Sequence, residues 1–175
     1  HPVFVTNDTI DGLVTHGYKC ADVLCPDPYS PALDYVPNFL KKINEIARPG
    51  MAWWLTPWHS ANQTHFKRPY GDGGPYSYRI FRNQYFASIC YGAKGFTPYT
   101  SAFFMPEIEY RYGLPPVWRE LRFLEPAICA SAPAEPPVLE GDAGLALWAR
   151  EHDGQVTVIA VNHTEAALSG EIVWP

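Results

Sequence analysis

The 175-residue sequence predicts an α/β fold: the C-terminal half of a (β/α)8 barrel, strands five to eight, followed by the first antiparallel strands of a β-sandwich. Short apolar runs alternate four times with loops and helical patterns, which is typical of parallel strands joined by helical crossovers. After a proline-rich connector, apolar runs flank an Asp-Gly turn instead, which is typical of antiparallel strands. We therefore expect two domains, covering residues 1–132 and 133–175.

Four short apolar runs are predicted as the parallel strands. They cover residues 2–6, 21–25, 51–55 and 94–99. The first three are expected to be buried, because parallel strands are covered on both faces and read as continuous apolar runs. Each of the four runs ends next to polar or aromatic residues.

Apolar residues at spacings of three and four predict the helices between these runs. One helix is expected over residues 36–47, ended by Pro49-Gly50, and another over 78–89, ended near Gly92. A third is expected to begin at Pro115-Pro116, since proline is tolerated in the first helical turn, and to continue to Ile128. A long polar, glycine-rich loop is expected from Thr56 to about Pro75.

The last part of the sequence has a different pattern. The β-rich runs 145–149 and 156–161 flank Asp153-Gly154, the strongest short-range signal for a hairpin. Residues 170–174 predict a third antiparallel strand. The connector over residues 130–137 contains three prolines, and for this reason the domain boundary is placed near residue 132.

A half barrel has one structural alternative, an independent four-stranded doubly wound domain. Four β/α units are too few to close a barrel, and the first strand begins almost at residue 1. No glycine-rich phosphate loop of the kind found in nucleotide-binding folds follows any of the predicted strands. The half barrel is therefore preferred, and the doubly wound domain stays open.

Composition and charge restrict the possible partners. The sequence is 47% hydrophobic and 15% aromatic but only 18% charged, so it supports a folded core. The net charge is -5 and the Lys and Arg residues are scattered, so no nucleic-acid partner is expected. No apolar run is long enough to cross a bilayer, so no membrane partner is expected either. Because no initiator Met or signal peptide opens the sequence, we expect a piece of a longer protein. Its compartment stays open, with an extracytoplasmic or secreted location slightly favoured.

The four cysteines and the histidine-containing loop do not form a metal site in the sequence. Cys20, Cys25, Cys90 and Cys129 contain no C-x-x-C pair, and buried free thiols are expected. His59 and His65 could be combined with Asp72 as metal ligands, but their spacing matches no compact zinc site. We therefore expect no metal and no other cofactor.

Functional residues are expected at the C-terminal ends of the four strands, because the active sites of such barrels lie there. These ends and the loop after the last strand contain Asn7, Asp8, Asp27, Tyr29, Trp54, Thr56, Trp58, His59, Thr97, Tyr99, Glu107 and Glu109. Aromatic rings stack on the apolar faces of sugars, while carboxylates and amides hydrogen-bond to the sugar hydroxyls. The set therefore predicts a carbohydrate as the ligand.

Three segments resemble the last three barrel strands of (β/α)8 glycoside hydrolases. These segments are Ala-Asp-Val-Leu-Cys-Pro-Asp-Pro-Tyr, Trp-Trp-Leu-Thr-Pro-Trp-His and the stretch from Arg79 to Tyr99, which contains Gly-Ala-Lys-Gly-Phe. The likeness covers about residues 20–130 and is strongest to β-galactosidase-like and other multidomain enzymes whose barrel is followed by a β-sandwich. The resemblance implies a carbohydrate substrate and, as a further partner, the remainder of the same polypeptide or enzyme.

The sequence departs from that family at one important position. In its retaining enzymes an acid/base Glu ends strand four and a nucleophilic Glu ends strand seven. Strand seven here is 51–55, and it is followed by Thr-Pro-Trp-His without a carboxylate. Either other carboxylates, such as Asp8 or Asp27, act in catalysis, or the barrel binds sugar without hydrolysing it.

Asp27 is the predicted catalytic residue, because Pro26 and Pro28 hold it rigidly and catalytic groups need rigid placement. A role as a turn former is the alternative. Trp53 and Trp54 must point to opposite faces of their strand, so one of them belongs to the core. The predicted substrate-binding residues are Asp8, Tyr29, Trp54, Trp58, His59, Tyr99 and Glu107. The predicted function is glycoside hydrolysis by two carboxylates, with an inactive sugar-binding barrel or a purely structural α/β domain as alternatives.

Overall fold

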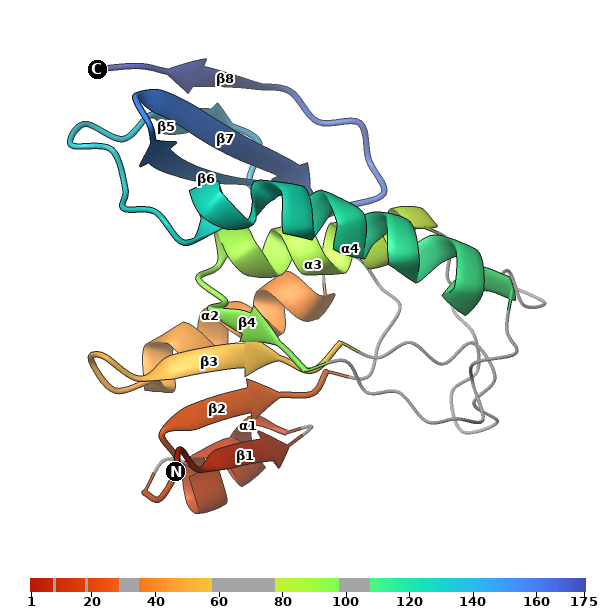
Figure 1. The fold of residues 1–175 in the computed structure, drawn as a ribbon, viewed down its shortest axis with the longest axis vertical. Coiled ribbons are helices and arrows are strands. Elements are labelled where there is room, and N and C mark those ends of the chain that lie inside the picture. The colour runs from red at the N-terminus through yellow and green to blue at the C-terminus, as the bar shows by residue number, and fades with distance from the viewer. Residues whose placement is uncertain (8, 18, 29–34, 58–77, 98–107) are drawn as a thin grey trace.

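The computed structural model describes residues 1–7, 9–17, 19–28, 35–57, 78–97 and 108–175. Strands and helices alternate in the first part of the chain and give way to strands alone in the second (Figure 1). The first part contains β1 (Phe4–Asn7), α1 (Ile10–Gly12), the π-helix η1 (Leu13–Gly17), β2 (Val23–Pro26), α2 (Tyr35–Ile46), β3 (Ala52–Leu55), α3 (Tyr78–Cys90), β4 (Gly95–Phe96) and α4 (Ile108–Ile128). The second part contains β5 (Val138–Gly141), β6 (Leu145–His152), β7 (Gln155–Asn162) and β8 (Gly170–Val173).

The first four strands form one parallel sheet in the order β1-β2-β3-β4. Each strand pairs with the next one along the chain: Thr6 lies opposite Cys25, and Trp54 lies opposite Gly95. A parallel sheet with helical crossovers, followed by antiparallel strands, confirms the predicted mixed α/β class.

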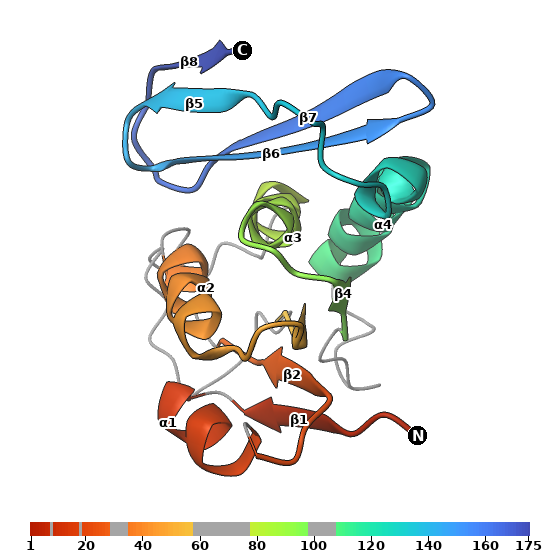
Figure 2. The same cartoon turned by 90° about the vertical axis from the view of Figure 1, so that its left-hand side faces the viewer.

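The described helices of the crossovers gather on one side of this sheet (Figure 2). Leu24, Trp53 and Leu55 of the strands form a single buried cluster with apolar residues of η1 and α2. Because successive side chains of a strand point to opposite faces, the residues between these three point away from the helices. We call that other side of the sheet the inner face.

The strand β1 is less buried than the sequence predicts. Phe4 is 44% exposed and Val5 is only partly buried, because β1 is an edge strand. The crossover after β1 contains α1 and η1, which the sequence analysis does not predict. Their signal is Thr9, an N-cap whose hydroxyl accepts a hydrogen bond from Gly12 N at 3.0 Å, and Leu13 anchors the segment in the core.

The prediction that a helix begins at Pro115-Pro116 is wrong. The helix α4 begins at Ile108, so both prolines lie inside it, and Glu109 belongs to the helix rather than to a loop. Proline removes a backbone donor and crowds the preceding turn, which disfavours an interior position. Here Leu114 and Val117 on either side are completely buried in a cluster with α3, and this packing keeps the segment helical.

The hairpin predicted around Asp153-Gly154 is confirmed. β6 and β7 pair antiparallel, with His152 opposite Gln155. Asp153 and Gly154 both have positive φ, at 50° and 72°, as a type I′ turn requires. The predicted last strand, β8, is also present, but it pairs with β5, a strand that the sequence analysis does not predict.

The hairpin packs on α3 and α4. Trp148, Ile159 and Val161 share one buried cluster with Tyr85 and other apolar residues of the two helices. Two polar contacts accompany this packing. Asn83 Nδ2 donates to the carbonyl oxygen of Asn162 at 2.7 Å, and the Tyr91 hydroxyl lies 3.1 Å from His163 Nε2. The boundary expected near residue 132 stays a prediction.

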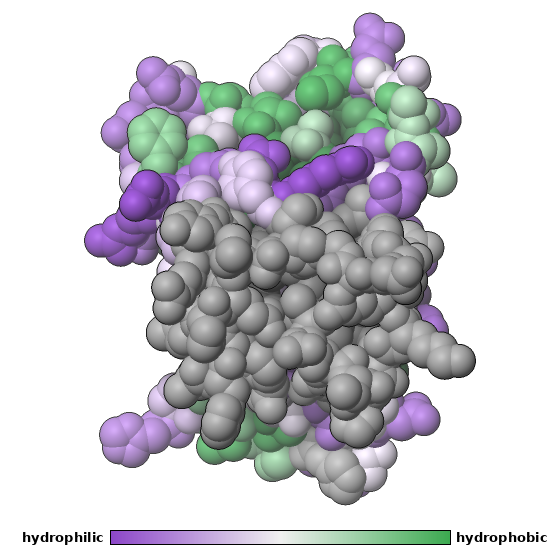
Figure 3. Space-filling model, turned by 90° about the vertical axis from the view of Figure 1, so that its right-hand side faces the viewer, coloured by the Kyte–Doolittle hydropathy of each residue, from purple (hydrophilic) through white to green (hydrophobic). Residues whose placement is uncertain are grey.

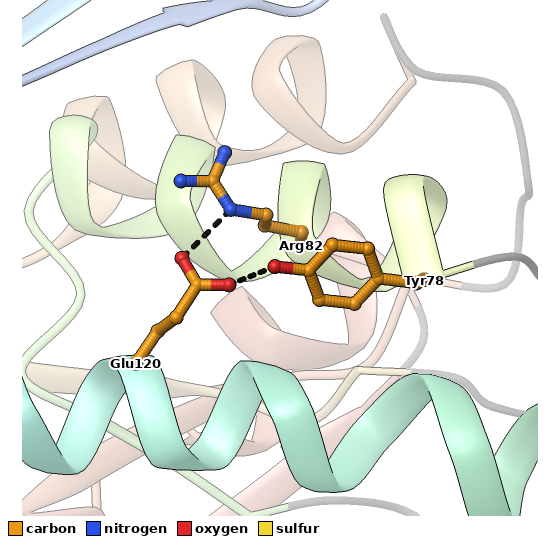
Figure 4. A network of polar contacts seen from close by, with 3 residues as sticks. All are labelled: Tyr78, Arg82 and Glu120. Carbon is orange, nitrogen blue, oxygen red and sulfur yellow. Dashed lines mark hydrogen bonds and ion pairs between the residues drawn. The ribbon is translucent and has the colours of Figure 1, made fainter.

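A further polar network joins α3 to α4 at the protein surface (Figure 4). Arg82 Nε lies 2.8 Å from Glu120 Oε2, and the Tyr78 hydroxyl donates a hydrogen bond to the other carboxylate oxygen of Glu120. Glu120 therefore fixes two positions of α3, one turn apart, against α4.

Candidate functional site

The carboxyl ends of the four parallel strands meet at one edge of the sheet. The hydrogen-bond ladder continues beyond the strands, because Asp27 N donates to Asn7 O at 3.0 Å and Thr56 N donates to Pro26 O at 2.8 Å. Between β3 and β4, Thr97 N donates to Leu55 O at 2.9 Å. These bonds hold Asp27, Thr56 and Thr97 at neighbouring strand ends, which is the position of active sites in parallel α/β enzymes.

Asp27 is the only buried acidic residue among those that the structure describes, with 5% of its surface exposed. Both neighbouring prolines, Pro26 and Pro28, are buried as well, so the predicted rigid setting agrees with the packing. Side-chain alternation along β2 puts Asp27 on the same face as Cys25, the inner face. Because burying a carboxylate is costly, this position favours a specific role for Asp27. Whether that role is catalytic stays a prediction.

Trp54 lies on the inner face, and Trp53 lies in the core. Trp53 is 3% exposed, and its Nε1 donates to Asn44 Oδ1 of α2 at 3.0 Å. The Trp54 ring packs against Phe4 of β1 with ring centroids 5.1 Å apart. It also covers Gly95, where an added Cβ would lie 2.8 Å from the ring. The Trp54 ring therefore leaves room for glycine, and for no larger residue, at position 95.

Hydroxyl and thiol groups share the inner face with Asp27, by the alternation of side chains along the strands. Thr56 Oγ1 and Thr97 Oγ1 are 2.8 Å apart. The Cys25 thiol is hydrogen-bonded to the hydroxyls of Thr97 and Thr6. Through these contacts, side chains contributed by β1, β2 and the ends of β3 and β4 form one hydrogen-bonded group that crosses the sheet. We call these four residues, Thr6, Cys25, Thr56 and Thr97, the hydroxyl row.

The electrostatic setting keeps the Cys25 thiol protonated. Burial raises the pKa of Cys25, and the hydrogen bonds from Thr97 and Thr6 offset this rise only in part. A buried neutral thiol is a poor nucleophile, because the thiolate is the reactive form. Cys25 therefore belongs to the floor of the site as a small polarizable group.

The sequence places Thr56 and Thr97 at strand ends without marking them as site residues, and it does not point to Thr6 or Cys25. The signal that would have found Cys25 is its position two residues before Asp27, because residues two apart on a strand share a face. The same rule connects Thr6 to Cys25, its partner in the register of the parallel sheet.

Asn7 ends β1 but has a different task. Its Oδ1 accepts hydrogen bonds from Thr9 N at 3.0 Å and Thr9 Oγ1 at 2.9 Å. Its side chain also occupies the space next to Gly12, where an added Cβ would lie 2.2 Å from Oδ1. The Asn7 amide therefore shapes the turn into α1.

Several predicted site residues lie outside the described residues, and their positions stay predictions. These are Asp8, Tyr29, Trp58, His59, Tyr99 and Glu107, together with His65 and Asp72 of the metal site that the sequence analysis weighed.

Two of the four cysteines correct the expectation of buried thiols. Cys20 and Cys129 are exposed, whereas Cys25 is buried and Cys90 is partly buried. Cys20 lies in the turn between η1 and β2, and Cys129 lies just beyond the end of α4. Neither residue packs into the core.

No cluster of three His, Cys, Asp or Glu residues that would suit a metal ion occurs in the described part of the chain. Within the same ranges, no helix combines the length and apolar character needed to span a bilayer. Comparisons of the chain with known protein families, with curated proteins and with solved structures found no match. The residues at the carboxyl edge of the sheet are therefore the basis for a proposed function.

Proposed function

We propose that the carboxyl edge of the parallel sheet is the carbohydrate site of a glycoside hydrolase and that Asp27 is one of its catalytic carboxylates. The observation that carries this proposal is the burial of Asp27, alone among the described acidic residues, at a parallel strand's carboxyl end. Barrel glycosidases use carboxylates held in this position.

The proposal includes a half (β/α)8 barrel, strands five to eight, as the fold of residues 1–132. Two features support it over a doubly wound domain. The strands follow one another in chain order, whereas a doubly wound sheet reverses its order at a switch point. The described helices cover one side of the sheet, as in a barrel, whereas a doubly wound sheet has helices on both faces (Figure 2).

The antiparallel strands support the proposed start of a β-sandwich. Apolar residues gather on the surface over these strands (Figure 3). Val138 is 59% exposed and Trp174 is 52% exposed, and smaller exposed areas belong to Val156 and Ile172. A second sheet packed face to face would cover such residues, as in other sandwiches.

The inner face offers groups suited to a sugar. The Trp54 ring, next to the end of β3 on the inner face, offers an apolar surface on which the C–H face of a pyranose can stack, and Phe4 at the amino end of β1 packs against this ring. Asp27 would act as general acid or base, and a second carboxylate would attack the anomeric carbon or activate a water molecule. The end of β3 has no carboxylate, so the second group must come from another strand end or loop; Asp8 and Glu107 are the candidates in this sequence.

The test is hydrolysis of a panel of chromogenic aryl glycosides by the protein that contains this chain. Asp27→Asn should lower turnover at least ~100-fold on any hydrolysed glycoside, the lower limit for loss of a general acid or base. The matched control is Asp153→Asn in the hairpin turn, where the positive φ of 50° suits asparagine. Unchanged turnover in a folded Asp27→Asn protein would make Asp27 a turn residue.

A sugar-binding protein without hydrolytic activity is the second candidate. The specific observation in its favour is the sequence Thr56-Pro57 after β3, where retaining enzymes of the resembling family have their nucleophile. Sugar binding measured by calorimetry, together with no hydrolysis of any glycoside in the panel, would select this candidate over the enzyme.

A further inference from the structure

An open cavity of about 510 Å³ lies at the protein surface between α3 and α4. Its lining residues are Tyr78, Arg79, Arg82 and Asn83 of α3 and Glu120 of α4. The volume is within the range of small-molecule sites. The cavity belongs to the helix layer, whereas Asp27 and Trp54 lie on the inner face, on the other side of the sheet. It is therefore separate from the proposed catalytic site, and we call it the helix cavity.

Most of the side chains that line the helix cavity are held in place before any ligand binds. Glu120 accepts hydrogen bonds from the Tyr78 hydroxyl and from Arg82 Nε (Figure 4). Asn83 Nδ2 donates to the carbonyl oxygen of Asn162 at 2.7 Å, so the hairpin fixes this side chain from the other direction. Side chains that are ordered in advance lose less entropy when a ligand binds. This order distinguishes the cavity from a surface of mobile polar side chains.

The fixed side chains still offer groups to a ligand. Tyr78 is 41% exposed, so part of its ring remains available for stacking. Arg82 contacts Glu120 through Nε, and Figure 4 shows its two terminal nitrogens pointing away from this carboxylate. The Arg82 guanidinium lies over the Phe86 ring, 4.8 Å from its centroid, which steadies it further. A stacking ring beside planar hydrogen-bonding groups is the combination that suits a sugar.

The helix cavity has an excess of positive charge. Glu120 pairs with Arg82 at 2.8 Å, whereas Arg79 forms no ion pair or hydrogen bond with the residues that the structure describes. The whole chain has a net charge of -5, so this excess is not a general property of the surface. A neutral sugar would leave Arg79 unused. A bare inorganic anion would leave the Tyr78 ring unused and would lie near the Glu120 carboxylate. A ligand with both a sugar ring and a carboxylate uses all of these groups.

We propose that the helix cavity binds a uronate unit of an acidic oligosaccharide. The uronate carboxylate pairs with Arg79, and the C–H face of its ring stacks on Tyr78. The ring hydroxyls bond to Arg82 and Asn83. No covalent bond forms or breaks in this site. The inference goes beyond the proposed hydrolysis, because the cavity shares no residue with the carboxyl edge of the sheet and its test needs no active enzyme.

The test is calorimetric titration of the protein that contains this chain with two oligouronates, α-linked trigalacturonate and β-linked triglucuronate. Neutral trisaccharides of the same two linkages are the matched ligands, because they differ only in lacking the carboxylates. At least one oligouronate should bind about tenfold more tightly than its neutral counterpart. Its affinity should fall as the salt concentration rises, because the contact with Arg79 is exposed to solvent.

Variants of the cavity connect this binding to the named residues. Arg79→Gln should weaken uronate binding at least about tenfold and remove most of the preference over the neutral sugar. Tyr78→Ala should weaken binding about threefold to tenfold through loss of the stacking surface. Arg119→Gln is the matched control, because Arg119 is an exposed arginine of α4 outside the cavity. Circular dichroism checks the fold of each variant.

Uronate binding that falls in Arg79→Gln and not in Arg119→Gln supports the proposal. Absence of uronate binding, equally tight binding of the neutral trisaccharides, or equal effects of the two arginine changes would overturn it. Inorganic phosphate is the probe for a plain anion site. If phosphate displaces the uronate with equal affinity, the sugar assignment is wrong.

The catalytic site is judged separately. Arg79→Gln should leave the turnover of neutral aryl glycosides unchanged, and Asp27→Asn should leave uronate binding unchanged. Loss of uronate binding in a folded Asp27→Asn protein would assign the uronate to the carboxyl edge and overturn the helix cavity. A protein that binds uronate through Arg79 and hydrolyses no glycoside would support the cavity and overturn the proposed hydrolysis.

Discussion

The hydroxyls of Thr56 and Thr97 lie 2.8 Å apart and join the carboxyl ends of β3 and β4. These residues are 41 positions apart in the chain, and Thr56 is 4% exposed. Their hydrogen bond closes the hydroxyl row on the side of the site opposite β1. It thereby fixes the distance between two strand ends where a ligand of this edge would lie.

Replacement of either hydroxyl in this pair should destabilise the protein modestly. We expect Thr56→Val and Thr97→Val each to lower the free energy of unfolding by about 1 kcal/mol, the usual net value of such a hydrogen bond. The double variant should lose less than the sum, because the second change removes a bond that is already broken. Urea denaturation measures all three. Thr157→Val in β7 is the control, and strict additivity would contradict the coupling.

The adjacent tryptophans of β3 should behave differently when truncated. Trp53→Ala should lower the free energy of unfolding by about 3–5 kcal/mol, because it empties a core position and removes the donor to Asn44 Oδ1. Trp54→Ala should cost less stability and should weaken sugar binding by about 0.5–1.5 kcal/mol, the value of an aromatic contact. Thermal melting and calorimetric titration measure the two effects. Equal losses of stability would contradict the assignment of the two faces.

The cysteines should divide into two reactivity classes. Burial raises the pKa of Cys90 from near 9 to about 12, and it raises that of Cys25 in the same direction. In the native protein the exposed Cys20 and Cys129 should react with a thiol reagent, whereas Cys25 and Cys90 should react only after unfolding. Mass spectrometry of the labelled peptides identifies which thiols react. Early labelling of Cys25 would contradict its burial.

The same pKa shifts have a consequence for stability at alkaline pH. Below the ordinary thiol pKa both the native and the unfolded state are protonated, so the contribution of Cys90 is fully present. Above about pH 9 the unfolded state loses the proton while the native state keeps it, which favours unfolding. Stability should thus fall as pH rises from near 9 toward 12, and Cys90→Ala should reduce this slope in denaturation curves.

Glu120 should control the titration of Tyr78 (Figure 4). The hydrogen bond to the Glu120 carboxylate is the main reason that the pKa of Tyr78 is raised. Glu120→Gln should therefore lower the pKa of Tyr78 toward its ordinary value, as seen in a difference titration of tyrosinate absorbance. Glu125→Gln is the control, because Glu125 pairs with Arg122 on the same helix, at 3.0 Å. An unchanged titration in Glu120→Gln would contradict this contact.

Local patterns in the sequence predict those parts of the fold that local forces determine. The apolar spacing in α2 and the positive φ of Asp153 and Gly154 have direct signals in the residues concerned. The position of α4 does not, because Pro115 and Pro116 argue against an interior position until the burial of Leu114 and Val117 is known. Tertiary packing overrides the local preference there.

In the candidate site, too, local sequence predicts some features and tertiary packing determines the others. The strand ends and the rigid setting of Asp27 follow from the sequence alone. The choice of Trp53 for the core does not, since alternation shows only that the two tryptophans face opposite ways. The hydroxyl row needs the register between strands as well, because Cys25 and Thr97 are far apart in the chain and meet only when the sheet is assembled.

The cluster that joins the hairpin to α3 and α4 has a consequence for the cooperativity of unfolding. Tyr85 is completely buried and touches Phe96 of the parallel sheet, while its own cluster includes Trp148 and Ile159 of the hairpin. Local unfolding of the hairpin would expose this tyrosine and weaken its packing against β4. The two ends of the molecule should therefore melt in a single transition, with α3 as the element that neither end can lose.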